Sequence, residues 1–388
     1  MIKLNLNKSS AASSGRLCAL KRVAALIIAA ILVMVLTACP NSASSSGGGG
    51  TPPNVGSVED TGDGFVKIIP PTTGIVGVDT DYTLPGTEAH WKGVFIKDRK
   101  VKLSPYKLGK TEVTYKLWKE VYDEAVKAEN GYKFANEGQK GSDGTGNDEE
   151  QPVTNISWRD CIVWCNAYTQ IKQGSDEQCV YRKKDDHMVV LKDATDTTAC
   201  DAAYADMSKK GFRLPTEAEW ECAARWQGSD KTNAVQYGDV WLTKVNSASG
   251  AKKPIGFSAL GSLPEGETWE SLRDELTRVA VYKKWFDGSN WVDQPTAVTK
   301  TAAVKSKDAN ALGLHDMSGN VWEWCFDWYG SIRAGEVIDP QGAASGSNRV
   351  SRGGCWNFIA YYCAVGYRGN FSPGDRHNFL GFRLAWRP

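Results

Sequence analysis

The amino-acid sequence predicts a mixed α+β fold built from short strands, few helices and much irregular structure. Three observations favour this class. Stretches with strand character are only a few residues long, helical spacing is confined to a few intervals, and turn-forming Gly, Asp and Asn fill the segments between them. The 388 residues can form one large domain or two ordinary ones.

Short strands are expected near the start of the globular part, at residues 64–69, 94–96, 106–108 and 112–114. Residues 131–150 are rich in Gly, Asp and Asn and are expected to form a surface loop. No internal repeat is visible, and no second hydrophobic core stands apart from the first. The sequence therefore favours one domain with long irregular connections.

Helices are expected at residues 116–127 and 157–171, and residues 155–157 should cap the second. Residues 211–221 read as a strand end that turns sharply into a helix. Its N-cap is Thr216, and Glu219 completes a capping box. The helix at 157–171 places five side chains on one face: Trp158, Cys161, Ile162, Cys165 and Tyr168.

The N-terminus has the features of an export signal. Basic residues precede an apolar run at 23–36, which is shorter than the roughly 20 residues that a membrane-spanning helix needs. The run ends in Leu-Thr-Ala-Cys39, which resembles a bacterial lipobox. We therefore expect residues 1–38 to be a lipoprotein signal peptide and Cys39 to be lipidated. The alternative is a plain signal peptide in which Cys39 is incidental.

Residues 39–60 are rich in Ser, Gly and Pro and are expected to tether the domain to the lipid. The domain is then expected at 61–388, with an insertion at about 247–305, where no clear periodicity appears, and a variable region at 352–388. The expected location is the outer membrane or cell surface. The formal net charge of +1 shows no bias toward nucleic acid, and we expect a monomer without a nucleic-acid partner.

Eight cysteines remain after the signal and Cys39 are set aside. The i, i+4 pair Cys161 and Cys165 favours a buried small-residue face over a bridge or a metal pair. Cys179 and Cys200 bracket a polar excursion and could form a disulfide or remain free.

The last 37 residues combine fixed motifs with interchangeable positions. Arg352-Gly353-Gly354-x-Trp356 opens the segment and residues 380–385 close it, and we call these the frame. The residues between them can be coded by triplets that differ from an asparagine codon only at its two adenines. Their mixture of aromatic and small polar side chains is typical of binding surfaces. They are Asn357, Phe358, Ile359, Tyr361, Tyr362, Tyr367, Asn370, Phe371, Ser372, Asp375, His377, Asn378 and Phe379.

We call these thirteen residues the variable positions, and we expect them to project to solvent on one continuous surface. Runs such as Phe358-Ile359 and Tyr361-Tyr362 have neither strand nor helix periodicity, so they cannot all face one core. The alternative is that the aromatics are ordinary core residues. Val365, Gly369 and Gly374 fit the same codon rule and cannot be assigned to either group.

Motifs in a fixed order resemble the formylglycine-generating-enzyme (sulfatase-modifying factor) family over roughly residues 65–388. They include Arg213-Leu214-Pro215-Thr216-Glu217, Gly319-Asn320-Val321-Trp322-Glu323-Trp324, the Arg-Gly-Gly motif and Gly381-Phe382-Arg383-Leu384. The resemblance implies a C-type-lectin-like fold with a small twisted sheet and two main helices.

The family's oxidase chemistry uses two copper-binding cysteines, which fall here on Phe358 and Cys363. Phe358 cannot bind a metal, so we expect no copper and no enzymatic activity, and we expect Cys363 to be a packed core residue. An exported copper-dependent oxidoreductase of the formylglycine-generating type is the alternative.

The resemblance also implies a structural calcium site. Its ligands would be the side chains of Asp316 and Glu323 and the main-chain carbonyls of Gly319 and Val321. The alternative is that Glu323 only accepts hydrogen bonds in a metal-free loop. Trp322 and Trp324 are expected in the core on either interpretation.

The frame around asparagine-derived positions also resembles the variable region of diversity-generating-retroelement target proteins, in particular variable surface lipoproteins of the treponemal type. This resemblance implies a surface-displayed binding protein whose ligand is set by mutation of the variable region. A binder of fixed specificity is a further alternative. The sequence does not identify the ligand.

Overall fold

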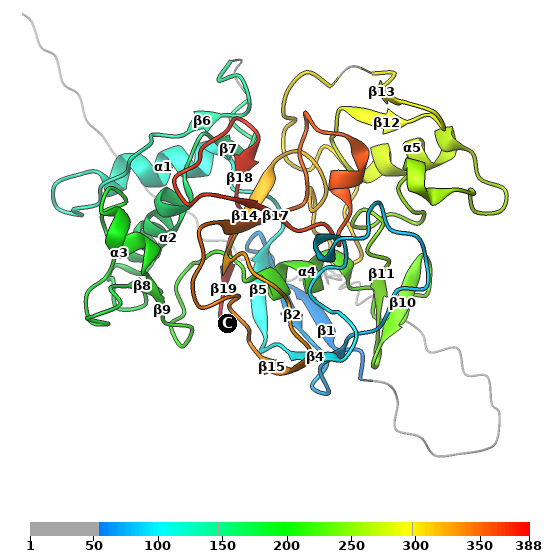
Figure 1. Cartoon of the computed structure of the whole chain (residues 1–388). Helices are drawn as coiled ribbons and strands as arrows, with labels where there is room; N and C mark the ends of the chain where they lie inside the picture. The colour runs from blue at the N-terminus through cyan, green and yellow to red at the C-terminus, as the bar shows by residue number, and fades with distance from the viewer. Residues whose placement is uncertain (1–53, 146–147, 297) are drawn as a thin grey trace, which may run out of the picture. The chain divides into compact units, whose positions relative to one another are not determined.

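The computed structural model describes residues 54–145, 148–296 and 298–388, all of which belong to one compact unit, Pro52–Pro388 (Figure 1). The predicted signal peptide, Cys39 and most of the predicted tether lie outside the described residues. None of the helices in the described part is long and apolar enough to cross a membrane.

The mixed α+β class is confirmed, because short strands and irregular segments surround a few helices. The structure contains more helix than the two main helices expected. The α-helices are α1 (Tyr115–Ala125), α2 (Trp158–Gln173), α3 (Thr197–Asp201), α4 (Glu217–Arg225) and α5 (Trp269–Val279), and the 3-10 helices are η1 (Ala89–Trp91), η2 (Ser258–Leu260) and η3 (Ala360–Cys363).

The strands form several small sheets. One has the order β1 (Ser57–Asp60), β2 (Phe65–Ile69), β5 (Tyr106–Gly109) and β19 (Ala385–Trp386), and another has β17 (Gly369–Phe371), β16 (Arg349–Arg352), β14 (Trp322–Trp328) and β18 (Leu380–Gly381). A third joins β15 (Gly335–Ile338), β4 (Arg99–Lys102) and β3 (Ile75–Val76). Two-stranded pairs are β6 (Gln139–Lys140) with β7 (Val153–Thr154), β8 (Tyr181–Arg182) with β9 (Tyr204–Ala205), β10 (Ala234–Tyr237) with β11 (Val240–Thr243), and β12 (Lys284–Phe286) with β13 (Trp291–Asp293).

The predicted helix starts are confirmed. The Ser157 hydroxyl accepts a hydrogen bond from the Asp160 amide, and the Asp160 carboxylate accepts one from the Ser157 amide. Thr216 and Glu219 form the same reciprocal pair at the start of α4. These pairs satisfy amide donors that the first helical turn cannot bond internally.

Two predicted strands are wrong. Residues 94–96 and 112–114 contribute only isolated bridges, between Val78 and Ile96 and between Thr114 and Pro152. Their backbone groups bond elsewhere: the Val94 amide donates to the Glu221 carboxylate, for example. A strand ladder therefore cannot form there.

The predicted tether extends too far, because residues 57–60 form β1 and pair with β2. The expectation of an aperiodic insertion at 247–305 is also incomplete. Helix α5 buries Leu272, Leu276 and Val279 on one face, and with β12 it helps to form a cluster of buried residues separate from the two larger ones. The core is thus divided into three clusters rather than one.

The eight described cysteines are all buried free thiols. Cys161 and Cys165 lie in the face of α2 that packs into the first core cluster, as predicted. A disulfide between Cys179 and Cys200, one of the two outcomes left open by the sequence, is not formed. Cys363 is a core residue, and so are Trp322 and Trp324.

Candidate binding face at the C-terminal segment

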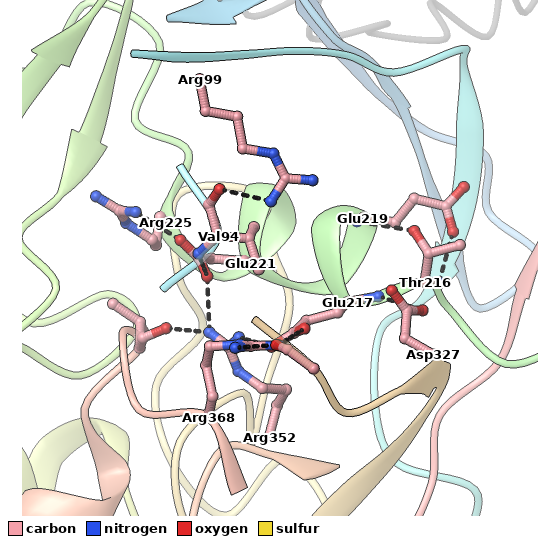
Figure 2. A network of polar contacts seen from close by, with 12 residues as sticks. Val94, Arg99, Thr216, Glu217, Glu219, Glu221, Arg225, Asp327, Arg352 and Arg368 are labelled. Atoms are coloured by element: carbon pink, nitrogen blue, oxygen red, sulfur yellow. Dashed lines mark hydrogen bonds and ion pairs between the residues drawn. The ribbon is translucent and has the colours of Figure 1, made fainter. Parts of the chain in front are cut away.

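The start of the variable region is fixed by buried ion pairs to helix α4 (Figure 2). The fully buried Arg352 guanidinium donates to Glu217 at 2.8 Å and to Glu221 at 2.9 Å. Both acids lie one helical turn apart on the same face of α4, as i, i+4 spacing requires. Arg225 and the Val94 amide complete the coordination of Glu221.

A second arginine, which sequence reasoning missed, fixes the other end of this loop. Arg368 donates from Nε and Nη2 to the two oxygens of Glu217, at 2.7 and 2.8 Å. Arg352 and Arg368 therefore hold residues 353–367 between two contacts to one carboxylate (Figure 2). Sequence alone could not indicate this pairing, because Arg368 and Glu217 are 151 residues apart.

These charges set the protonation of the network. Burial alone would raise the pKa of Glu217, but Arg368 and Arg352 hold it below its usual range. Asp327 accepts a hydrogen bond from the Glu217 amide at 2.9 Å, and burial, together with repulsion by the Glu217 carboxylate, raises its pKa to about 8. The network therefore contains an ionised Glu217 beside a protonated Asp327 at neutral pH.

The closing part of the frame has a comparable anchor. Arg383 makes a two-point ion pair with Glu323, which also accepts a hydrogen bond from the Trp220 ring nitrogen at 2.7 Å. The strand pairing of β18 with β14 brings Gly381 beside Glu323. The frame therefore closes against the central strand of the sheet.

The Gly-Gly turn between β16 and the variable residues requires glycine. Gly353 and Gly354 both have positive φ, at 97° and 78°. A Cβ on Gly354 would lie 2.8 Å from the carbonyl oxygen of Tyr362. Any side chain at Gly354 would push the variable loop away from the turn.

All thirteen variable positions are partly exposed; none is fully buried and none is fully exposed. The frame residues next to them are buried, except Trp356, which is partly exposed. Val365 and Gly369 are buried and therefore belong with the frame, and a Cβ on Gly369 would lie 2.7 Å from the Ser351 hydroxyl. Gly374 is exposed.

The variable aromatics gather over one buried ring. Trp322, only 2% exposed, contacts four of them, with ring centroids 5.8 to 6.4 Å apart. Aromatic pairs at such distances contribute about 0.5–1.5 kcal/mol beyond area burial. The four rings on Trp322 belong to Phe358, Tyr362, Tyr367 and Phe371.

Fixed aromatic residues from distant parts of the chain extend this surface. Trp91 contacts Tyr361 and Tyr367 with centroids 5.1 and 4.5 Å apart, and Trp291 contacts Tyr361 at 5.2 Å. The Lys283 amide donates to the Phe358 carbonyl, which places β12 beside η3 (Figure 1). The predicted insertion thus forms one wall of the face, which the sequence did not indicate.

Several polar variable positions are tied to the domain by hydrogen bonds. The Asn378 amide donates to the Ser142 carbonyl, and Asn370 accepts from the Asn348 side chain at 2.6 Å. Asp375 accepts from the Ser372 amide. These contacts and the aromatic cluster correct the expectation that the positions simply project to solvent, because several of the side chains also pack on the domain.

The two positions that carry cysteine in the copper enzymes do not form a metal site here. Phe358 packs against Tyr362 and Phe379, and burial raises the pKa of the Cys363 thiol far above its usual range. Among the described residues, no three or more His, Cys, Asp or Glu side chains lie close enough to hold a metal ion. The residues at these positions do not fit copper.

The predicted calcium ligands fit a cation in part. Asp316 is buried, and its Oδ1 has no hydrogen-bond partner, whereas both oxygens of Glu323 are held by Arg383. Glu112 is buried nearby; burial and repulsion by Asp316 and Glu323 raise its pKa. The unpartnered Oδ1 of Asp316 is therefore better placed to bind a cation than the oxygens of Glu323.

The large cavities of the described part lie away from the variable positions. One of about 590 Å³ lies between α5 and residues 294–296 and 298–307, and others border β15 and β9. None of the thirteen variable positions lines these cavities, and their side chains form a partly exposed surface. This shape is suited to contact with a macromolecule, since protein interfaces are broad and small-molecule sites concave.

This fold and frame define a class of protein. Residues 82–388 match the family of sulfatase-modifying factor enzyme 1-like domains, and the chain belongs to this family. Its relatives include the formylglycine-generating enzyme of Streptomyces coelicolor, 33% identical over 51% of this chain and 52% of that enzyme. They also include a protein described as chaperone protein LppX of Paenibacillus barcinonensis, 27% identical over 74% of this chain and 82% of that protein.

Among solved structures, the chain is similar to Treponema denticola variable protein 1. The two are 32% identical, with a TM-score of 0.53, and the alignment covers 86% of this chain and 99% of that one. The family therefore contains both formylglycine-generating enzymes and a variable protein. The chain spans about half of the Streptomyces enzyme.

Proposed function

We propose that this protein is a surface-displayed ligand-binding lipoprotein whose C-terminal variable region is diversified by a retroelement. The observation that carries the proposal is the pattern of burial: the thirteen variable positions are all partly exposed, and nearly all of the frame is buried. Similarity to a treponemal variable protein supports the same function. The protein is not an enzyme in this proposal.

A pair of libraries tests this function. In one, the thirteen variable codons are replaced by codons that vary at their first two bases, and in the other the same number of frame codons is randomised. The first library should yield mostly protease-resistant protein and binders to unrelated targets, since exposed positions seldom control folding. Equal loss of folding in both libraries would contradict the proposal.

The genome offers an independent test of the retroelement. The locus should hold a near-copy of the segment encoding residues 352–385, with adenines at the variable positions, beside a reverse-transcriptase gene. A sulfatase gene in the neighbourhood and no such copy would instead favour the oxidoreductase.

Incubation with copper, oxygen and a cysteine-containing sulfatase peptide tests the enzyme alternative directly. We expect no formylglycine by mass spectrometry, because Phe358 supplies no thiolate. Phe358→Cys is the matched variant, because it restores two thiols at the family spacing. Turnover by the unaltered protein would establish the oxidoreductase.

Anchoring rests on Cys39. Cys39→Ala should leave soluble or uncleaved protein that no longer partitions into detergent, because stable anchoring needs more than one acyl chain. Normal cleavage and full partitioning of that variant would exclude the lipid anchor.

We further propose a monomer that binds no nucleic acid and holds one structural Ca²⁺, ligated by Asp316 and the carbonyls of Gly319 and Val321.

A further inference from the structure

A second candidate site lies at the far end of β14. This strand runs from Trp322, under the variable positions, to Trp328. The six steps between these two residues span about 20 Å. Two adjoining cavities, of about 730 and 680 Å³, share Trp328 and residues 341–344 in their walls. None of the thirteen variable positions lines either cavity.

Both cavities are rich in cations. The walls of the larger contain Arg99, Arg333 and Arg368 and no carboxylate, and of these three only Arg368 is paired, with Glu217. Those of the smaller contain Lys184 and Arg349 and a single acid, Asp201, whose two oxygens are held by Arg159. Because the whole chain has a formal charge of only +1, these cations are a local concentration of charge.

Arg349 is almost fully buried and pairs with no carboxylate within the described part of the chain. Its Nη1 and Nη2 donate to the carbonyls of Phe326 and Asp201, and its Nε has no partner. Its guanidinium lies between the rings of Trp158 and Trp328, 3.6 and 3.5 Å from their centroids. Burial lowers the pKa of Arg349 to about 9, which still leaves it charged at neutral pH.

Several other buried arginines in this domain are neutralised by glutamates. Arg213 pairs with Glu219, and Arg383 with Glu323. The charge of Arg349 has no such partner, so its field reaches the cavity that it lines.

The remaining cations are available as well. Arg99 is 8% exposed, donates only to the Val94 carbonyl and has an unpartnered Nε. Arg333 and Lys184 are exposed and form no ion pair within the described part of the chain. A buried charge therefore lies behind each cavity, with a free cation at its edge.

We propose that these adjoining cavities bind an acidic oligosaccharide through its carboxylate or sulfate groups. Guanidinium groups suit such anions, since their planar donors match two acceptor oxygens. The half-buried Trp328, which lies in both walls, and Tyr204 in the smaller cavity offer ring surfaces for the apolar faces of sugars. Nucleic acid fits less well, because the cavity walls offer a few local cations beside two rings rather than an extended row of contacts to a regular phosphate backbone.

Titration of the full chain in detergent with a heparin octasaccharide tests the site. The double variant Arg333→Glu/Lys184→Glu should weaken binding by about tenfold or more, because two charge-assisted contacts are lost. The control Lys210→Glu/Lys252→Glu changes the net charge equally at exposed lysines outside both cavities, and it should bind as the unaltered protein does.

Three outcomes would overturn the proposal: absence of binding, equal weakening by both double variants, or equally tight binding of duplex DNA with the same number of charges. The site is independent of the proposed variable face. Tyr361→Asn, on that face, should leave heparin binding unchanged, so failure of one proposal does not decide the other.

Discussion

The C-terminal segment contains two kinds of position, the frame residues and the variable residues, and they differ in what they contact. Frame residues such as Arg352 and Arg383 place full charges in the interior, each matched to a glutamate. Variable residues such as Phe371 contact other rings and solvent. A buried charge accepts only one partner geometry, whereas a half-exposed ring can be replaced by another side chain. The sequence can therefore vary at positions where another side chain can make equivalent contacts.

Loss of a frame carboxylate should give the largest effect. Glu217→Ala would leave Arg368 buried without its counter-ion and Arg352 with Glu221 alone, and removal of one partner from a buried pair costs about 3–5 kcal/mol. Denaturant unfolding measures this change. Glu59→Ala removes an exposed ion pair and is the control, with an expected cost below about 1 kcal/mol. Similar costs for the two variants would contradict the inference that the ion pairs of Arg352 and Arg368 with Glu217 fix the variable loop.

The stability of the folded protein should also depend on pH through the buried acids around the frame, and not through the variable face. The pKa of Asp327 is raised to about 8 in the folded protein, above its ordinary value of 3.8. The folded state therefore keeps a proton that the unfolded chain releases, so stability falls as pH rises from about 4 to about 8. Asp327→Asn, which keeps an acceptor for the Glu217 amide, should flatten this dependence. An unchanged pH profile of the denaturation midpoint in this variant would contradict the assignment.

Calcium should stabilise the loop that precedes β14, which contains Asp316. A ligand at a hundred times its dissociation constant stabilises the native state by about 2.7 kcal/mol, so chelation should lower the melting temperature. Asp316→Asn should abolish this difference, because its unpartnered Oδ1 is the ligand expected to be free. If chelator leaves the melting curve unchanged and no metal is found in the purified protein, the loop is metal-free.

Local signals predicted much of the fold, but they did not indicate which distant residues surround the C-terminal segment. Capping boxes at Ser157 and Thr216 were readable because both partners lie within one helical turn. The wall residues Trp91 and Trp291 were not, because nothing near them in the sequence indicates a contact with the C-terminal segment. Arg368 was missed for the same reason. Helix α5 was missed although its buried residues Leu272, Leu276 and Val279 have the i, i+4, i+7 spacing of an amphipathic helix.

The smallest losses of unfolding free energy should come from substitutions in the variable face. These losses should still be larger than those at fully exposed positions. Phe371 contacts Trp322, Trp324 and Phe379 yet remains partly exposed, so Phe371→Ala should cost about 1–2 kcal/mol of unfolding free energy. Phe382, fully buried in the frame, is the matched control.

Phe382 packs against Trp118 and Trp164, and Phe382→Ala should cost about 3–5 kcal/mol, because the surrounding core cannot fill the cavity. The two variants remove the same side chain, so the difference between their denaturation midpoints measures only the environment. A cost at Phe371 equal to that at Phe382 would place the variable aromatics in the core. A ligand-binding face could not then be varied without loss of the fold, and the contrast between frame and face would fail.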